Sequence, residues 1–213
     1  PFSVCDWEAE RLSLSARNIQ VLAPARKGEC GVNNLNLRLQ EVLNPPAPDK
    51  PQLSWGETIF RLGDKVIQTR NDYRLPWVRE TAAGTEEGAG VFNGDVGFIT
   101  DLDPEHQLLT VRFDDERDVV YESGDLEDLE PAYCLSVHKS QGSEFPVIIM
   151  PVTPGPPMLL SRNLLYTAMT RARHLVVLVR TEEVIRRMVE KDHVIRRYTM
   201  LARRLTETRA LAP

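Results

Sequence analysis

The first stretch of the chain with a clear pattern is an apolar run followed by a helical stripe. Residues 18–23 (NIQVLA) are a short apolar run with the length of a buried strand. Residues 31–43 have the spacing of an amphipathic helix, whose apolar stripe is formed by Val32, Leu35, Leu39 and Val42. Residues 44–46 (NPP) end this helix, because proline has no amide hydrogen for the helical ladder. The proline-rich stretch through Pro51 predicts a linker and a domain boundary.

Residues 55–130 have the pattern of an all-β unit. Turn pairs such as Asn93-Gly94 and Asp103-Pro104 separate short β-type runs, which cover residues 65–68, 96–99, 108–113 and 119–121. This spacing is typical of a small antiparallel barrel or sandwich. Residues 80–90 are small, polar and glycine-rich, so we predict a mobile loop there.

After residue 131 the pattern alternates between strand and helix. Apolar runs predict three buried strands, at residues 133–137, 145–152 and 175–179. Residues 163–173 predict a helix between the last two strands, with an inward face of Leu164, Leu165, Ala168 and Ala172. Thr181 is a candidate cap for a last helical region, with buried positions at Ile185, Met188, Val189, Ile195, Tyr198, Leu201 and Leu205. The alternation predicts a parallel sheet, and therefore an α/β domain of residues 1–54 and 131–213 with the barrel of residues 55–130 inserted.

The composition is that of a folded protein. The chain has 213 residues, 42% of them hydrophobic, which suffices for one large domain or two small ones. No apolar stretch reaches the length of a membrane span, so we expect no membrane partner. The three cysteines are scattered and odd in number, which predicts free thiols in a reducing, cytoplasmic compartment, at Cys5, Cys30 and Cys134. The chain starts with neither Met nor a signal peptide, which is compatible with a piece of a longer protein.

The charges are unevenly distributed. The net charge of −5 argues against a purely electrostatic nucleic-acid binder. Residues 101–130 are rich in acids, whereas the chain from Arg162 onward is rich in arginine. Two interpretations remain open: two solvated faces of opposite sign, or a local basic groove.

Two polar runs between apolar segments are the best candidates for chemistry. The first is residues 136–145 (SVHKSQGSEF) and the second is residues 166–173 (YTAMTRAR). Runs of this kind lie at the ends of strands, where open parallel sheets bind ligands. In the first run, hydrogen bonds from Ser136 and His138 and the charge of Lys139 suit phosphate oxygens, while Gly142 permits close approach and Glu144 can accept from a sugar hydroxyl. The alternative is a hydrogen-bonded loop that binds no ligand.

Arg171 follows a predicted helix and precedes a strand, a position from which an arginine can reach a γ-phosphate bound by a neighbouring domain. The alternative for any single arginine is a surface salt bridge, which we expect for Arg173. Arg26 follows a buried strand and is a possible second phosphate sensor, although Lys27 is an equal candidate for that contact.

Several kinds of site have no sequence pattern in this chain. No G-x-x-x-x-G-K-[ST] segment is present, so the chain lacks the phosphate-binding loop (Walker A) of a P-loop NTPase. No spacing of His, Cys, Asp or Glu suggests a metal site, and no nucleophile elbow suggests a hydrolase triad. We therefore expect this chain alone not to hydrolyse ATP.

Four segments resemble motifs of superfamily 1 DNA helicases of the RecD/TraA type. Residues 136–145 resemble motif V, and residues 165–172 (LYTAMTRA) resemble motif VI. Residues 21–28 with 31–36 (VLAPARKG and GVNNLN) resemble the motif IV region. Residues 60–68 (FRLGDKVIQ) and 91–97 (VFNGDVG) resemble the SH3-like barrel of this subgroup. The resemblance implies that the α/β domain is the second RecA-like motor domain, a P-loop NTPase fold without Walker A, carrying an inserted SH3-like barrel.

The resemblance also implies roles for individual residues. Arg171 would be the arginine finger and Arg26 the motif IV arginine. The nucleotide would be contacted by Gln141, Gly142 and Glu144. Single-stranded DNA would be contacted by Ser136, His138, Lys139, Ser140, Phe92 and Asn93. Ser136 stands where the family often has threonine, which keeps the hydroxyl, whereas the long 79–90 segment departs from the family and weakens the barrel assignments.

The implied activity is ATP-driven 5′ to 3′ translocation on single-stranded DNA with strand separation, in a bacterial cytoplasm. ATP and Mg²⁺ would be bound mainly by a first motor domain outside this chain, and this part alone would need no cofactor. Expected partners are single-stranded DNA, ATP, the first motor domain and other repair proteins. The alternative is a non-catalytic nucleic-acid or protein interaction module whose barrel is the functional part.

Overall fold

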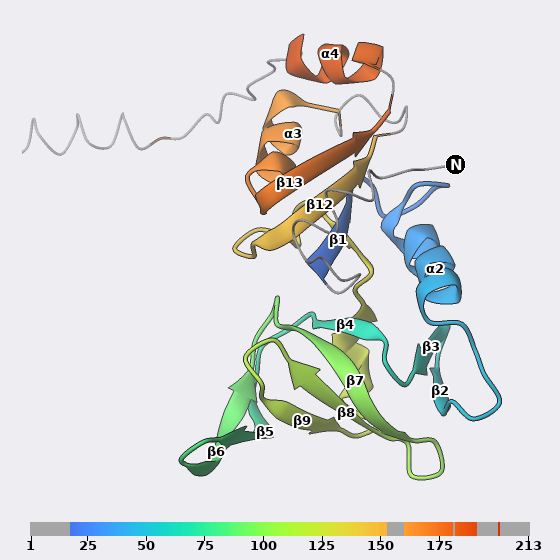
Figure 1. Ribbon diagram of the computed structural model, residues 1–213, viewed down its shortest axis with the longest axis vertical. Coiled ribbons are helices and arrows are strands. Elements are labelled where there is room, and N and C mark those ends of the chain that lie inside the picture. Colours follow the sequence, from blue (N-terminus) through green and yellow to red (C-terminus); the bar gives the residue numbers. More distant parts are fainter. Residues whose placement is uncertain (1–17, 153–159, 181, 191–199, 201–213) are drawn as a thin grey trace, which may run out of the picture.

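The computed structural model describes residues 18–152, 160–180, 182–190 and 200. Figure 1 shows an α/β part above an all-β part. The predictions for Cys5, for Thr181 as a cap and for the helical residues 191–199 and 201–205 lie outside the described residues. No helix within the described ranges is long and apolar enough to cross a membrane.

The α/β part is built on a four-stranded parallel sheet. Its strands are β1 (Ile19–Ala23), β11 (Cys134–Ser136), β12 (Phe145–Pro151) and β13 (Ala172–Val179), in the order β11-β1-β12-β13. Every neighbouring pair runs parallel. Buried residues of β12 share a core cluster with α3, as expected when a parallel sheet is covered, whereas β13, predicted as a buried strand at residues 175–179, has only half-buried and exposed residues. The predicted α/β class with a parallel sheet is confirmed.

Helices α3 (Arg162–Met169) and α4 (Glu182–Glu190) lie together above β13 in Figure 1. The Ser161 side chain caps α3 by accepting a hydrogen bond from the Leu164 amide. The predicted inward residues Leu164, Leu165 and Ala168 are buried, and they share one core cluster with Met188 of α4. Two predictions were wrong. The helix ends at Met169, so Ala172 instead begins β13 opposite Phe145, and Val189 is 45% exposed.

Helix α2 (Val32–Leu43) follows β1 and buries a partly polar face. The predicted stripe position Val42 is 76% exposed, which corrects that prediction, whereas Asn36 and Gln40 are buried. Asn36 donates to the Cys134 carbonyl at 3.0 Å and accepts from the Cys134 amide at 2.7 Å. These amide bonds attach α2 to the edge strand β11, where an aliphatic side chain would leave the strand's polar groups unpaired.

The all-β part contains a seven-stranded antiparallel sheet in the order β10-β4-β7-β8-β9-β5-β6. Its strands are β4 (Lys65–Gln68), β5 (Asp72–Thr81), β6 (Gly84–Val91), β7 (Val96–Asp103), β8 (Leu108–Phe113), β9 (Asp118–Tyr121) and β10 (Leu129–Pro131). A 3-10 turn, η2 (Leu126–Asp128), precedes β10. A separate hairpin is formed by β2 (Gln52–Trp55) and β3 (Thr58–Arg61). The predicted small antiparallel unit is confirmed.

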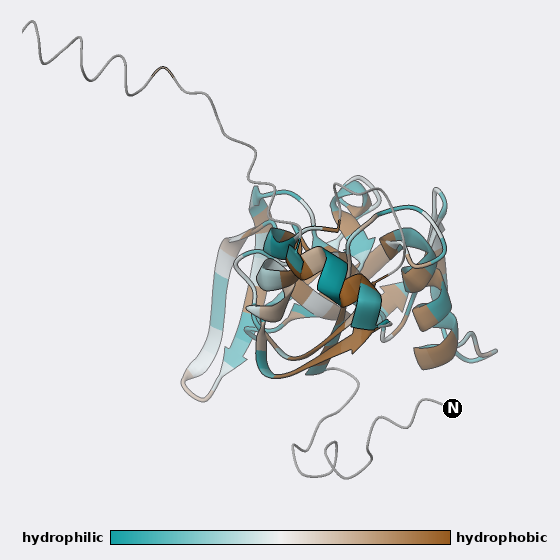
Figure 2. Cartoon of the chain, turned by 90° about the horizontal axis from the view of Figure 1, so that it is seen from above, coloured by the Kyte–Doolittle hydropathy of each residue, from teal (hydrophilic) through white to brown (hydrophobic). Residues whose placement is uncertain are grey.

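The segment predicted as a mobile loop, residues 80–90, is instead the turn and second strand of the β5–β6 hairpin. Packing explains why one residue of this strand is a glycine, since a Cβ on Gly88 would lie 2.4 Å from the ring of Trp77 on β5. Arg79 and Glu86 pair across the two strands. Figure 2 shows this projecting hairpin mainly in teal and white, so its composition is that of a solvated ribbon.

The two parts of the molecule share buried contacts. Ile67 of β4 and Val96 of β7 belong to the same core cluster as Leu22 and Leu135 of the parallel sheet. Asp64 is fully buried just before β4, and its carboxylate accepts bonds from α2, from its own turn and from the segment before β11. The donors are Gln40 Nε2 at 2.5 Å, Asn44 Nδ2 at 2.6 Å, the Arg61 amide at 2.8 Å and Tyr133 Oη at 2.8 Å. The barrel is therefore fixed against the α/β part.

Candidate nucleic-acid and nucleotide interface

The polar run 136–145 extends between opposite edges of the parallel sheet. Ser136 pairs with Ala23 where β11 and β1 end, and we call this the carboxyl edge. Phe145 pairs with Ala172 where β12 and β13 begin, and we call this the amino edge. The connecting loop 137–144 therefore leads from one edge to the other. It is folded by local bonds from the Ser140 amide to the Ser136 carbonyl and from the Ser143 amide to the Ser140 carbonyl.

The carboxyl edge collects two predicted phosphate-binding cations around one carboxylate. Glu130 accepts from Arg26 Nη2 at 3.3 Å and from Lys139 Nζ at 2.8 Å. The side chains of Arg26, Glu130 and Lys139 are 61%, 38% and 28% exposed. Arg26 and Glu130 border a cleft of about 310 Å³, whose other lining residues include Asn33 of α2 and Thr58 of β3.

Other predicted DNA contacts at this edge differ in accessibility. His138 is exposed and Ser136 is half-buried, with the Ser136 hydroxyl accepting from the Lys139 amide at 3.2 Å. Ser140 is fully buried, and its hydroxyl donates to the Val137 carbonyl at 2.9 Å. The direct DNA contact predicted for Ser140 does not fit this arrangement, because its hydroxyl stabilises the loop from inside.

At the amino edge Arg171 adjoins the far end of loop 137–144. The Arg171 carbonyl accepts from the Phe145 amide at 2.8 Å. Its guanidinium makes only long bonds, from Nη1 to the Ser143 carbonyl at 3.3 Å and from Nη2 to Thr170 Oγ1 at 3.4 Å. Its Nε is buried and has no hydrogen-bond partner among the described residues. This arginine is held near the loop without a carboxylate partner in the described part of the chain.

The remaining predicted nucleotide contacts also lie at the end of the loop near β12. Gln141 and Gly142 are exposed, and Gly142 has a φ of +92°, a conformation that favours glycine. Glu144 pairs with Arg173 at 3.0 Å, and both side chains are more than half exposed. The surface salt bridge predicted for Arg173 is confirmed, and it engages the Glu144 carboxylate that was predicted to face a nucleotide.

The predicted barrel contacts Phe92 and Asn93 lie in the turn between β6 and β7. Phe92 is 43% exposed and meets Tyr73 edge-on, with ring centroids 5.8 Å apart. The Asn93 amide donates to Asn71 Oδ1 at 2.8 Å, and Asn71 Nδ2 lies 3.3 Å from the Tyr73 hydroxyl. Sequence reasoning missed Tyr73, which is 69% exposed and gives the turn an aromatic pair.

The barrel turn lies near the amino-edge end of the loop. Residues 94–96 of the barrel and residues 143–145 line a shared pocket of about 230 Å³. Phe92 and Asn93 therefore adjoin the predicted nucleotide side of loop 137–144. The structure does not bring them together with Ser136 and Lys139 at the carboxyl edge.

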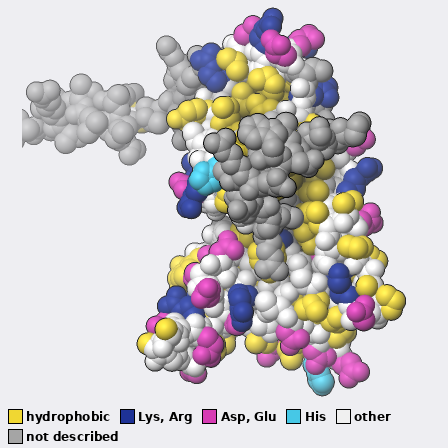
Figure 3. Space-filling model, viewed as in Figure 1, with side chains coloured by type: hydrophobic (Ala, Val, Ile, Leu, Met, Phe, Trp, Pro, Cys, Tyr) yellow, Lys and Arg dark blue, Asp and Glu magenta, His cyan; other side chains and the backbone are white. Residues whose placement is uncertain are grey.

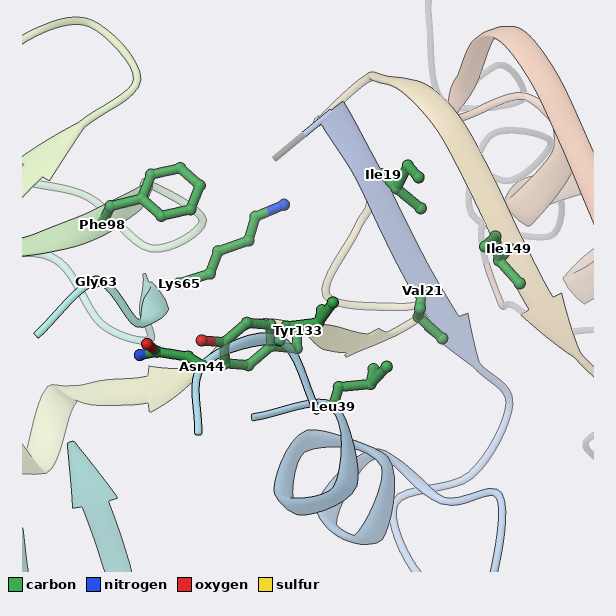
Figure 4. Close-up of a pocket in the computed structure, with 10 residues that line it drawn as sticks. Ile19, Val21, Leu39, Asn44, Gly63, Lys65, Phe98, Tyr133 and Ile149 are labelled. Carbon is green, nitrogen blue, oxygen red and sulfur yellow. The ribbon is translucent and has the colours of Figure 1, made fainter. Parts of the chain in front are cut away.

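An apolar cavity between β1, α2 and the barrel was not predicted. It has a volume of about 500 Å³ and is lined mostly by apolar side chains, including Ile19, Val21, Leu39 and Ile149. Figure 4 shows the Lys65 amine pointing into this space. Burial lowers the pKa of Lys65 to about 8, and Asp114 opposes the shift. The sequence signal was weak, since Lys65 is a single cation at the start of an apolar strand.

Several acidic side chains of residues 101–130 pair with arginines of the barrel. In Figure 3 the Lys and Arg side chains are interspersed among Asp and Glu side chains over the barrel on the face shown. Acids of the 101–130 segment bind arginines, as in the pairs Asp115–Arg117, Asp118–Arg112 and Glu127–Arg70. This favours the interpretation of mixed, solvated faces for that segment.

The described residues contain no group of three or more His, Cys, Asp or Glu side chains that could hold a metal ion. Cys30 and Cys134 are free thiols, as predicted for both. Burial raises the pKa of Cys134 to about 12, so its thiol stays protonated and has little nucleophilic character.

Two family models match the chain. The SH3 domain of ATP-dependent RecD-like DNA helicases matches residues 35–113, and the UvrD-like helicase C-terminal domain matches residues 131–179. The first range contains the barrel segments 60–68 and 91–97, and the second contains the segments that resemble motifs V and VI, whereas the motif IV segments lie almost entirely outside both ranges.

Relatives agree with these matches. The ATP-dependent RecD2 DNA helicase of Deinococcus radiodurans is 38% identical over 175 residues, covering 79% of this chain and 22% of that protein. The RecBCD enzyme subunit RecD of Mycolicibacterium smegmatis is 28% identical over 191 residues, covering 87% of this chain and 29% of that protein. The chain thus spans less than a third of either relative.

A solved structure agrees on the fold. The Bacteroides Pif1 helicase in complex with ADP-AlF3 and single-stranded DNA has a TM-score of 0.54 and 18% identity, covering 97% of this chain and 51% of that one. The matched models make DNA helicases the class that this chain resembles, and the solved structure shares its fold. Within that class, the chain resembles the C-terminal part of the RecD-type helicases.

Proposed function

We propose that this chain is the C-terminal part of an ATP-dependent 5′ to 3′ DNA helicase of the bacterial cytoplasm. It supplies the second motor domain, residues 1–54 and 131–213, and the inserted SH3-like barrel, residues 55–130. The observation that carries the proposal is the course of loop 137–144. This loop joins the cations at the carboxyl edge to Arg171 at the amino edge.

The amino edge is the proposed nucleotide side. ATP with Mg²⁺ is bound mainly by a first motor domain, and Gln141, Gly142 and Glu144 face the nucleotide from this chain. Arg171 acts as the finger that stabilises charge on the transferred γ-phosphoryl group. Its long bonds to Ser143 and Thr170 support this role, because few strong interactions oppose a movement of the guanidinium toward phosphate.

The carboxyl edge is the proposed side for single-stranded DNA. Ser136, His138 and Lys139 contact the phosphate backbone, which makes the binding independent of sequence. We assign Arg26 to this side instead of the predicted role of nucleotide-phosphate sensor, because it shares a carboxylate with Lys139 and lies at the edge opposite Arg171. Phe92 and Asn93 would contact the strand separately from the barrel turn near the amino-edge end of the loop, where an exposed aromatic ring can stack on a base.

A loop that touches both ligands can transmit the state of one site to the other. ATP binding closes the two motor domains, and hydrolysis and product release reopen them. Work is done only if the DNA contacts differ between these states. The loop 137–144 suits this coupling because internal bonds such as that from Ser140 to the Val137 carbonyl hold it as one unit.

The test is the Arg171→Ala substitution in the intact enzyme that contains this chain. We expect DNA-stimulated ATP hydrolysis to fall by about 10³- to 10⁵-fold, the effect of removing an arginine finger. Binding of single-stranded DNA in the absence of ATP should persist, because the substitution lies at the amino edge.

Arg173→Ala is the matched control, since this neighbouring arginine forms an exposed pair with Glu144. It should leave ATP hydrolysis within a few-fold of wild type, as exposed pairs contribute little. DNA-stimulated hydrolysis that survives in the Arg171→Ala enzyme would refute the finger assignment.

A further inference from the structure

The Glu130 carboxylate lies between the side chains of Arg26 and Lys139. Arg26 Nη2 donates to both carboxylate oxygens, at 3.3 Å and 3.4 Å, and Lys139 Nζ donates to Oε2 at 2.8 Å. Arg26 comes from the loop after β1 and Lys139 from the loop after β11, whereas Glu130 is carried by strand β10, which pairs with β4. One barrel residue thus joins two cations of the α/β part.

This donor set is suited to a phosphodiester as well as to a carboxylate. Arginine and lysine are the cations that bind nucleic-acid phosphates, one through a planar fork and the other as a point charge. The three side chains are partly exposed, and Arg26 and Glu130 border the 310 Å³ cleft, so an incoming strand can reach them. Ion pairs that are this exposed are weak and exchange readily.

We propose that Glu130 is an internal competitor that occupies the backbone-binding cations until a DNA phosphate displaces it. The inference rests on the proposed single-strand site at the carboxyl edge. A motor that moves along DNA must release each phosphate that it binds. When a phosphate leaves, Glu130 takes its place, so the two cations are not left unpaired and release is favoured. Glu130 therefore lowers the affinity for DNA and keeps DNA binding reversible.

The experiment compares Glu130→Gln with wild type in binding a fluorescein-labelled oligothymidylate, using the 213-residue chain and anisotropy over a range of salt concentrations. We expect the variant to bind about three- to tenfold more tightly, because the cations no longer have to exchange partners. The plot of log K against log salt should become steeper by about 0.7, the contribution of one further uncompensated cation on a single strand.

The matched control is Glu86→Gln, which removes the same charge from a glutamate paired with Arg79 in the β5–β6 hairpin. It should change the affinity by less than about twofold. A double-mutant cycle gives a second readout, since Arg26→Ala should weaken binding more in the Glu130→Gln background than in wild type. Thermal unfolding verifies that the variants are folded.

The outcomes separate the inference from the proposed function. If wild type binds the oligonucleotide and Glu130→Gln binds equally or more weakly, the competitor role is overturned. If Glu86→Gln tightens binding as much as Glu130→Gln does, the effect is one of net charge and the inference also fails. If neither wild type nor Glu130→Gln binds single-stranded DNA, the proposed site at the carboxyl edge is itself refuted.

Discussion

At the scale of single residues, Lys65 is a buried cation whose protonation is linked to folding. Its pKa lies near 8 in the folded chain because burial disfavours the charged form, against the ordinary value of 10.5. Between these two values the unfolded chain binds more protons than the folded chain. The free energy of unfolding from this group therefore increases as pH rises from about 8 to about 10.5, and below pH 8 the full penalty of burying the charge is present.

Lys65→Met should remove this pH dependence. We expect the variant to be more stable than wild type near pH 7, by on the order of 3 kcal/mol, and to lose that advantage by about pH 10.5. Urea unfolding at several pH values measures the difference in free energy of unfolding between the variant and wild type. Groups that titrate equally in both proteins do not contribute to this difference. Lys27→Met, at an exposed position, is the control and should show no such trend. A stability difference that is constant across this pH range would contradict the burial argument.

Residue-level chemistry also shows which parts of the site could be predicted. The position of Arg171 between a helix and a strand could be read from the chain, and in the structure it lies between α3 and β13. The inward side chain of Ser140 could not be identified, because a serine hydroxyl suits both a buried carbonyl and a phosphate. The burial of Asn36 and Gln40 could not be predicted for the same reason. Their polar side chains are buried because they hydrogen-bond to Cys134 and Asp64.

At the scale of elements, the β5–β6 hairpin depends on one buried arginine. Arg117, whose side chain is 10% exposed, donates to Asp95 at 2.7 Å, to Asp115 at 2.6 Å and to the Gly90 carbonyl at 2.7 Å. Its guanidinium also lies 5.9 Å from the centroid of the Trp77 ring. It thus connects β6, the turn before β7 and the turn before β9. The glycine-rich composition of residues 80–90 predicted a loop because these distant contacts have no local signal.

Arg117→Ala should destabilise the chain by about 3–5 kcal/mol, because it removes the charged partner of Asp95 and the side-chain donor to the Gly90 carbonyl in a partly buried site. Chemical denaturation monitored by tryptophan fluorescence measures the loss, and Trp77 reports on the hairpin directly. Arg112→Ala is the matched control, since Arg112 pairs with Asp118 on the surface and should cost less than about 1 kcal/mol. Equal losses in the two variants would show that burial of Arg117 is not the cause.

At the scale of the whole molecule, the parallel sheet and the antiparallel unit were predictable because strand periodicity and turn residues are local signals. The course of the polar run 136–145 was not predictable. The pattern of residues 136–145 does not reveal that the loop begins at one edge of the sheet and ends at the other. That course follows from the strand order β11-β1-β12, which depends on long-range pairing. The buried bonds of Asp64 to Gln40 and Tyr133 likewise depend on the assembled fold.

The absence of a Walker A loop from this sequence predicts what the purified chain does with ATP. Its 213 residues contain an arginine finger candidate but no Walker A loop to hold the phosphates. An arginine that stabilises transferred charge contributes nothing when no nucleotide is positioned against it. We therefore expect no ATP hydrolysis above background by the isolated chain, with or without oligothymidylate, in an assay of phosphate release. Linking the chain to the first motor domain of a RecD-type helicase should give DNA-stimulated hydrolysis that depends on Arg171. ATP hydrolysis that co-purifies with the isolated chain and persists in the Arg171→Ala variant would show that this chain holds a complete nucleotide site of its own.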